Sequence, residues 1–182
     1  MILVIGATGW LGREICRQLT EKDLPVRAMV RPISEPAKVA ELKNMGAIPV
    51  VGDLRDPVTF MSVLEGVDTV IATVSSMPFS YVPGDNDMQR VDEAGMIRFI
   101  ESAQQAGVRH FIYTSFSGDF GLDFPLAHAK RSVEGHLHQS GMTYTILRPS
   151  CFMEAWLTPA VGFDVANRQV TIYGDGTQKV SY

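Results

Sequence analysis

Three glycines near the start of the chain have the spacing of a phosphate-binding turn. Gly6, Gly9 and Gly12 lie in GATGWLG, between an apolar run and a helix-like segment. The first glycine permits a tight turn, the second lets the backbone approach a pyrophosphate, and the third lets the helix pack against the strand. The N–H groups and the dipole at the helix start favour an anion. Because this strand, turn and helix come first in the chain, the pattern predicts a dinucleotide site rather than a simple turn.

The residue after the second apolar run indicates which dinucleotide is bound. A carboxylate there would accept hydrogen bonds from an adenosine ribose, but in AMVRP the position holds Arg31. A guanidinium suits a phosphate dianion, so NADP(H) is favoured over NAD(H). Arg13, in the first turn of the helix, could add a second cation. The alternative for both arginines is an ordinary solvated position.

A further pair of residues follows the third apolar run, in VVGDLRDP. Asp53 could accept a hydrogen bond from the adenine amino group while Leu54 packs on the ring. The alternative for Asp53 is a helix-capping carboxylate, although Asp56 is better placed for that role because Pro57 follows it.

Composition restricts the class of protein. The 182 residues are 46% hydrophobic and 20% charged with a net charge of −4, which is typical of one globular domain and not of a nucleic-acid binder. Cys16 and Cys151 are too few for a disulfide framework or a zinc site, so we expect reduced thiols and no metal. The first apolar run begins at Ile2, and no run approaches the roughly 20 residues of a membrane span. The expected location is therefore cytoplasmic.

Short apolar runs alternate with helix-like segments along the chain. Strands are predicted at residues 2–5, 26–30, 48–51, 69–74, 110–115 and 143–147, and helices at 10–22, 35–45, 57–64, 86–106 and 127–140. Strict alternation of this kind predicts an α/β domain with a doubly wound parallel sheet. Two longer connections, 75–87 and 116–125, follow predicted strands and would form the rim of a ligand pocket, since ligands bind at the carboxyl ends of parallel strands. The alternative is that both are ordinary surface loops.

These motifs together resemble one family. VIGATGWLG, VRAMVRP, VVGDLRDP, VRHFIYTSFSG, HAKRSVEGHLHQSGMTYTILRPSCFMEAW and YGDGTQK occur in the order seen in the NmrA-like atypical short-chain dehydrogenase/reductases. The resemblance covers essentially the whole chain and implies an NAD(P)-binding Rossmann fold. Members of this family include quinone and phenylpropanoid reductases, and also redox-sensing regulators and assembly factors without turnover.

The resemblance also implies roles for particular residues. The pyrophosphate would be held by Gly6, Thr8, Gly9, Trp10, Leu11 and Gly12. Arg31 would bind the 2′-phosphate, and Asp53 with Leu54 the adenine. Thr73 and Val74 would lie beside the nicotinamide ribose, which Lys130 would hydrogen-bond. Residues 149–152, with Pro149 and Phe152 at their ends, would line the nicotinamide end.

The catalytic machinery departs from the family pattern. Most short-chain dehydrogenases place a tyrosine four residues before the lysine, as general acid or base, but here the position holds Leu126. Ser115 matches the region of the usual catalytic serine; its alternative is a hydroxyl that only bonds loop backbone. A desolvated Lys130 could itself be the acid, or it could only bind cofactor. Lys130 and Ser115 are the two candidate catalytic residues.

The expected organisation is a dinucleotide-binding domain over residues 1–150 and the start of an incomplete substrate lobe over 151–182. QVTIYGDGTQKVSY resembles a strand pair turning at 174–176. Family members usually continue for roughly another hundred residues that close the substrate lobe, within ordinary domain sizes. The chain is therefore expected to be a truncated or a minimal version.

Two functions follow from this pattern. The first is an NADPH-dependent reductase that transfers hydride to a small carbonyl, enone or quinone. The second is a non-catalytic NADP(H)-binding redox sensor or assembly protein with a regulatory protein partner, which Leu126 and the short C-terminus favour. Epimerase or dehydratase activity is a less favoured third function, because that chemistry usually needs the tyrosine. The sequence favours no particular oligomeric state.

Overall fold

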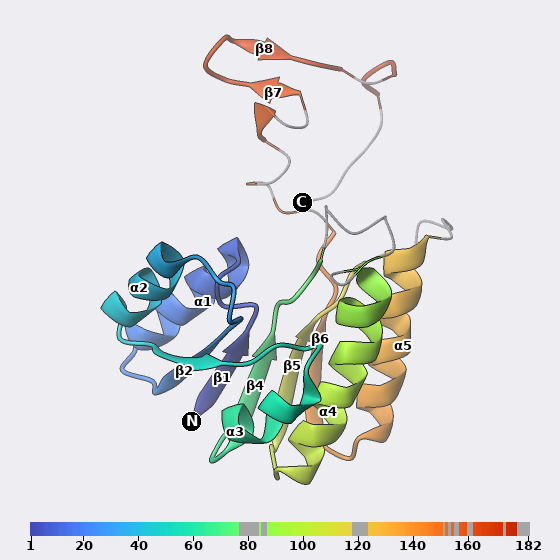
Figure 1. Ribbon diagram of the computed structural model, residues 1–182. Helices are drawn as coiled ribbons and strands as arrows, with labels where there is room; N and C mark the ends of the chain where they lie inside the picture. Colours follow the sequence, from blue (N-terminus) through green and yellow to red (C-terminus); the bar gives the residue numbers. More distant parts are fainter. Residues whose placement is uncertain are drawn as a thin grey trace.

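The fold is built on a parallel sheet in which the order of the strands reverses at the middle of the sheet. The structure is a computed structural model that describes residues 1–76, 84, 87–117, 124–150, 152, 154, 157–159, 162–172 and 174–177. Six strands pair in parallel in the order β3-β2-β1-β4-β5-β6 (Figure 1). They are β1 (Ile2–Ile5), β2 (Val26–Val30), β3 (Ile48–Val51), β4 (Thr69–Ala72), β5 (His110–Thr114) and β6 (Thr143–Leu147). The predicted doubly wound α/β fold is confirmed.

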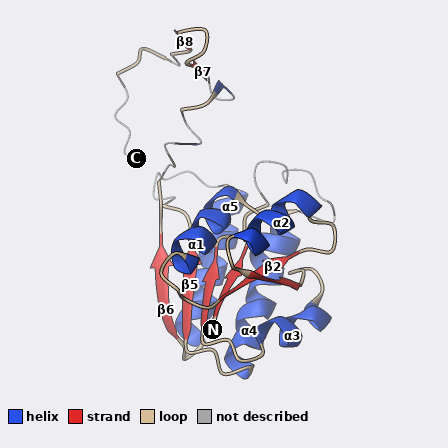
Figure 2. Cartoon of the chain, turned by 90° about the vertical axis from the view of Figure 1, so that its left-hand side faces the viewer, coloured by secondary structure: helices blue, strands red, loops and turns tan. Residues whose placement is uncertain are grey.

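Helices cover both faces of the sheet, because successive side chains of each strand point to opposite faces. Leu3 and Ile5 belong to one buried cluster with side chains of the helices after β3, and Val4 belongs to the other. One face carries α1 (Trp10–Thr20) and α2 (Pro36–Asn44), and the other carries α3 (Phe60–Leu64), α4 (Met96–Gln105) and α5 (Pro125–Gln139) (Figures 1 and 2). The central strands are buried from both sides, which explains their nearly continuous apolar sequences.

Most predicted strand boundaries hold, whereas α1, α2 and α5 differ from the predicted helices by one or two residues at their ends. The strands predicted to reach residues 74 and 115 end at Ala72 and Thr114. The helix predicted from residue 57 begins as a 3-10 turn, η1 (Pro57–Thr59), before α3. Asp56 caps this turn as expected, since its side chain accepts a hydrogen bond from the Val58 N–H.

The helix predicted over 86–106 is not regular. It includes the π-helical segment η2 (Gln89–Gly95), and α4 follows directly. Gly95 lies where η2 meets the turn after β3: a Cβ on it would stand 2.7 Å from the carbonyl oxygens of Leu54 and Arg90. The wider turn buries Asp92 beside the apolar Val91, and 3.6-residue periodicity does not predict the burial of this carboxylate.

The C-terminal part contains a hairpin that was not predicted: β8 (Gln169–Val170) pairs with β7 (Phe163–Asp164) in antiparallel fashion around a turn before Gln169. The chain also turns at 174–176, as predicted. The second arm expected after residue 177 lies outside the described residues. β7 and β8 lie apart from the six-stranded sheet in both views (Figures 1 and 2). Within the described part of the chain, no helix is both long enough and apolar enough to cross a bilayer.

Candidate functional site

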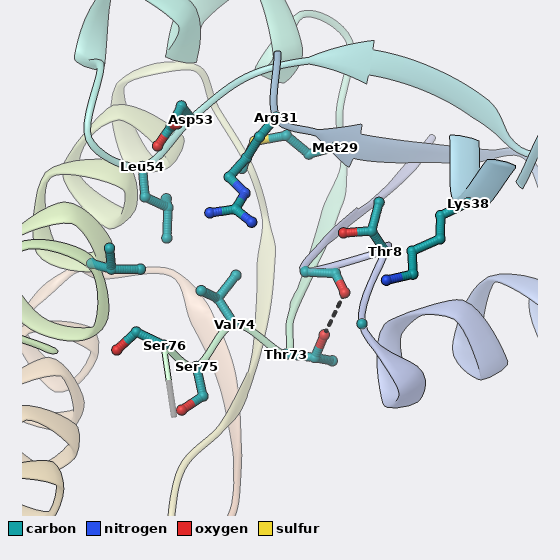
Figure 3. Close-up of a pocket in the computed structure, with 13 residues that line it drawn as sticks. Thr8, Met29, Arg31, Lys38, Asp53, Leu54, Thr73, Val74, Ser75 and Ser76 are labelled. Carbon is teal, nitrogen blue, oxygen red and sulfur yellow. Dashed lines mark hydrogen bonds between the residues drawn. The ribbon is translucent and has the colours of Figure 1, made fainter. Parts of the chain in front are cut away.

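A cavity of about 330 Å³ opens at the carboxyl ends of β1, β2 and β4, where the strand order reverses. This is the position at which parallel α/β sheets bind ligands. Figure 3 shows the side chains around it. The lining residues are Gly6, Thr8, Gly9, Met29, Arg31, Lys38, Asp53, Leu54, Thr73, Val74, Ser75, Ser76 and Val91. Eight of the residues predicted to bind cofactor are therefore brought together here: Gly6, Thr8, Gly9, Arg31, Asp53, Leu54, Thr73 and Val74.

The glycine turn has no room for side chains. Gly6 has a φ of +84°, and a Cβ on it would lie 2.7 Å from Thr73 Oγ1. A Cβ on Gly12 would lie 2.2 Å from the Gly6 carbonyl oxygen, so only glycine lets α1 start so close to β1. The Gly9 N–H donates to the Gly6 carbonyl at 2.9 Å, which closes the turn. A glycine turn of this kind, directly before a helix, is where dinucleotide-binding folds hold a pyrophosphate.

Two cationic side chains line the cavity together with the glycine turn. Arg31 follows β2 and Lys38 lies on α2, and both direct their charged ends toward the cavity (Figure 3). Lys38 Nζ also pairs with Glu35 at 2.8 Å. Arg13, the second cation expected from the sequence, does not line this cavity and pairs with Glu41 at 2.7 Å. The sequence signal for Lys38 was present, since it is a basic residue in the helix directly after Arg31.

The Asp53 carboxylate is largely occupied within the protein. Arg55 donates to it from Nε at 2.9 Å, from Nη2 at 2.5 Å and from its backbone N–H at 3.0 Å. The hydrogen bond from the Arg55 side chain lowers the pKa of Asp53 and outweighs the effect of burial. Asp53 thus lines the cavity as an ionised group, while Leu54 offers an apolar surface for a planar ring beside it.

The opposite wall is the chain that leaves β4. Thr73 Oγ1 donates to the carbonyls of Ile5 at 3.1 Å and Gly6 at 3.5 Å, which ties this wall to the glycine turn. Lys130, on α5, lies behind the wall and donates to the Val74 carbonyl at 3.1 Å. It is only 4% exposed and does not itself line the cavity. Leu126 is buried one turn earlier on α5.

Ser115 belongs to a separate ionic cluster. Its Oγ donates to Glu134 Oε1 at 2.5 Å, and the same carboxylate pairs with Arg131 and Arg148, each at 2.5 Å. Burial raises the pKa of Glu134, but the hydrogen bonds from Arg148 and Ser115 and the charge of Arg131 lower it more. The cluster joins β5, α5 and the end of β6. The Ser115 hydroxyl is therefore engaged by Glu134, outside the cavity lining.

We expect Glu134→Gln to destabilise the protein by about 2 kcal/mol, because the two arginines then lose a buried carboxylate. The Glu134 pKa is depressed by folding, so its contribution is present above the ordinary glutamate range and is lost as the pH falls through the folded-state value. Urea unfolding at neutral and acid pH measures both effects. Glu21→Gln, which breaks the exposed pair with Arg17, is the control and should change little. Equal midpoints for Glu134→Gln and wild type at neutral pH would contradict this prediction.

The remaining predicted residues lie outside the cavity lining. Trp10 and Leu11 open α1, and the Trp10 ring meets Phe152 edge to face at 6.2 Å between centroids. The Pro149 carbonyl accepts from the Ser117 N–H at 3.1 Å. Cys16 is a buried free thiol, and burial raises its pKa to about 11. Cys151 and most of the two predicted rim loops lie outside the described residues. Sequence reasoning missed three lining residues, Met29, Lys38 and Val91, whereas Ser75 and Ser76 belong to the connection 75–87 that was predicted to form the rim of the pocket.

Comparisons with known proteins agree with this geometry. A family model described as NAD(P)H-binding matches residues 6–177. The photosystem II assembly factor Ycf39 of Trieres chinensis is 36% identical over 154 residues, which is 84% of this chain and 46% of the relative. An NAD(P)H azoreductase of Xenophilus azovorans is 35% identical over 156 residues, 85% of this chain and 49% of the relative.

A solved structure also matches. The NADPH-dependent quinone oxidoreductase QOR2 of Escherichia coli, complexed with NADPH, has a TM-score of 0.69 and 30% identity, and the match covers 86% of this chain and 51% of that one. The chain thus spans about half the length of these relatives. The family match covers nearly the whole chain and includes both the glycine turn and most of the parallel sheet. The chain therefore belongs to the NAD(P)H-binding proteins of the NmrA-like, atypical short-chain dehydrogenase/reductase type.

Proposed function

We propose that this protein is an NADPH-dependent reductase that transfers hydride to a small carbonyl, enone or quinone. The observation that carries this proposal is the cavity itself. Its glycine cradle and two cations suit a phosphorylated dinucleotide at one end, and its other wall is backed by a buried lysine. When bound, NADPH would supply the hydride from C4 of its nicotinamide.

The residues of the chain have separate tasks in this proposal. Gly6 and Gly9 admit the pyrophosphate, and Leu54 covers the adenine. Arg31 and Lys38 bind the 2′-phosphate, which supports a preference for NADPH over NADH because a second cation strengthens the attraction of a dianion. Thr73 and Val74 lie where the nicotinamide ribose would come.

Lys130 is the proposed proton donor in place of the missing tyrosine. Its ammonium has three N–H donors, of which one donates to the Val74 carbonyl, and Asp92 Oδ1 lies at ion-pairing distance, 3.5 Å from Nζ. A remaining N–H would donate to the ribose or to the acceptor, which requires Nζ to reach past the wall behind which Lys130 lies. One hydride and one proton convert a carbonyl to an alcohol, or a quinone to a hydroquinone, so the reaction balances with one NADPH and one proton from solvent returned to Lys130.

The substrate would bind between this wall and residues 151–182, which we propose are the start of a substrate lobe. Exposed apolar side chains occur along it, as a surface that packs against further chain would require: Leu157, Val165, Val170 and Ile172. The names of the azoreductase and the quinone oxidoreductase support acceptors with conjugated, reducible groups. A cytoplasmic location is part of this proposal.

A second candidate function is a non-catalytic NADP(H)-binding sensor or assembly protein. The observation that favours it is Leu126, which is buried at the position of the usual proton donor and has no proton to give. The similarity to an assembly factor supports a protein partner in the same way. In this case the cavity would still bind NADPH, but no acceptor would oxidise it.

Titration with NADPH and NADH, followed by mixing with acceptors, tests the two functions. The protein is titrated while nicotinamide fluorescence is recorded, and menadione, an enone and an azo dye are then added separately while absorbance at the NADPH band is followed. Tighter binding of NADPH than of NADH with oxidation by an acceptor supports the reductase. Binding without oxidation by any acceptor supports the sensor, and binding of neither nucleotide contradicts both.

A further inference from the structure

A group of buried polar side chains lies directly behind the cavity wall. Asp92 is fully buried, Lys130 is 4% exposed and Ser76 is 6% exposed. Charged side chains are almost never buried to this degree without partners, because they lose their hydration. The three residues come from η2, α5 and the chain after β4, so only the packed fold brings them together.

The two oxygens of Asp92 face different partners. Oδ2 accepts hydrogen bonds from the Ser76 backbone N–H at 3.0 Å and from the Ser76 hydroxyl. Oδ1 lies 3.5 Å from Lys130 Nζ, which is within ion-pairing distance but too long for a good hydrogen bond. Asp92 therefore links a residue of the cavity wall to the buried lysine.

The π-helical segment explains how a carboxylate reaches this place. In η2 each turn holds an extra residue, and Asp92 is buried on the same segment as Val91, which lines the cavity. Gly95 lets the segment approach Leu54, since a Cβ would collide with the Leu54 carbonyl. The same irregular turn thus supplies part of the adenine side of the cavity and the partner of Lys130.

We propose that Asp92 is the positioning residue for Lys130, holding its ammonium in the protonated state at the nicotinamide end of the cavity. This inference rests on the proposed reductase function. In each turnover Lys130 Nζ gives one proton to the acceptor oxygen that gains negative charge from the hydride, and it takes one proton back from water. Asp92 never touches the acceptor.

The charges around Lys130 show why the carboxylate matters. Burial lowers the pKa of Lys130, and the negative charge of Asp92 acts in the opposite direction. From β5, the Tyr113 ring centroid lies 5.1 Å from Nζ, but the Tyr113 phenol is neutral because burial raises its pKa. The charged or titratable neighbours on α5 are His128, Arg131 and Glu134. Glu134 is already paired with two arginines, so Asp92 is the carboxylate that faces Lys130 within the described chain.

Asp92→Asn tests the proposal, since the amide keeps the size of the side chain and an acceptor for Ser76. The chain has five lysines, so lysine labelled with ¹³C at Cε gives a resolvable NMR titration, with Lys130→Arg to assign the signal. We expect the Lys130 pKa to fall by about one unit or more in Asp92→Asn. The alkaline limb of kcat for menadione reduction should move to lower pH by the same amount, which means about a tenfold loss above that limb per unit. Acid pH should restore kcat, which a merely structural defect would not allow.

Glu93→Gln is the matched control, because it removes the adjacent carboxylate of the same segment. It should leave the Lys130 titration and the pH profile as in wild type. NADPH affinity should also be unchanged in Asp92→Asn, because the phosphate ligands are intact. An unchanged Lys130 pKa in Asp92→Asn would overturn the proposal. If wild type binds NADPH but reduces no acceptor, the reductase function fails, and the NMR titration still decides whether Asp92 controls Lys130.

Discussion

Gly12→Ala is expected to abolish measurable NADPH binding and to lower the free energy of unfolding by about 3 kcal/mol. The added methyl group would stand 2.2 Å from the Gly6 carbonyl oxygen, 2.7 Å from the Gly6 carbonyl carbon and 2.9 Å from Ala7 Cα. All three atoms belong to the backbone, so no side-chain rotation relieves the collision. Either α1 must move away from β1 or the turn must open, and both displace the N–H groups of the cradle.

The measurement combines urea unfolding with fluorescence titration of NADPH. Gly135→Ala is the control, because it makes the same chemical change on α5, where an added Cβ meets nothing within 4 Å. That variant should gain about 0.5–1 kcal/mol, since alanine is a better helix former than glycine, and should bind NADPH as wild type does. Gly12→Ala with wild-type stability and affinity would show that the turn is looser than the structure describes.

Arg31→Asp is expected to weaken NADPH binding by about 100-fold, because a charge-assisted, bidentate contact is lost and a repulsive carboxylate replaces it. Arg31 points into the cavity from the end of β2, and Lys38 alone would face the phosphate (Figure 3). NADH carries no 2′-phosphate, and a carboxylate at this position can accept hydrogen bonds from the ribose hydroxyls. Its affinity should therefore stay the same or rise, which reverses the preference between the two nucleotides.

Arg13→Asp is the control for this reversal. Sequence reasoning placed both arginines near the phosphate, but Arg13 pairs with Glu41 and does not line the cavity. The Arg13→Asp substitution should leave the ratio of NADPH affinity to NADH affinity unchanged, as measured by parallel fluorescence titrations. Equal losses of NADPH and NADH affinity in Arg31→Asp would mean that the residue supports the fold of the site and does not select the phosphate.

Local sequence was sufficient for the fold class and for half of the cavity. Four of the six strands of the sheet run between their predicted bounds, because apolar, β-branched runs form strands wherever both sheet faces are covered. Gly6, Gly9, Arg31 and Asp53 were found because each lies within four residues after the end of a predicted strand. The carboxyl ends of parallel strands meet at one edge of the sheet, so the order of motifs along the chain already determines their convergence.

Tertiary structure decided what lies between distant segments. Arg13 pairs with Glu41 because α1 packs against α2, and no local pattern encodes this pairing. The Ser115 hydroxyl is engaged by Glu134, nineteen positions away. Asp92 meets Lys130 only because a π-helical turn departs from the regular helical period. The sequence alone thus determined the type of sheet and the glycine turn, since both depend on near neighbours in the chain. A buried ion pair forms only where two opposite charges are removed from water side by side. The packing of distant segments determines which charges these are.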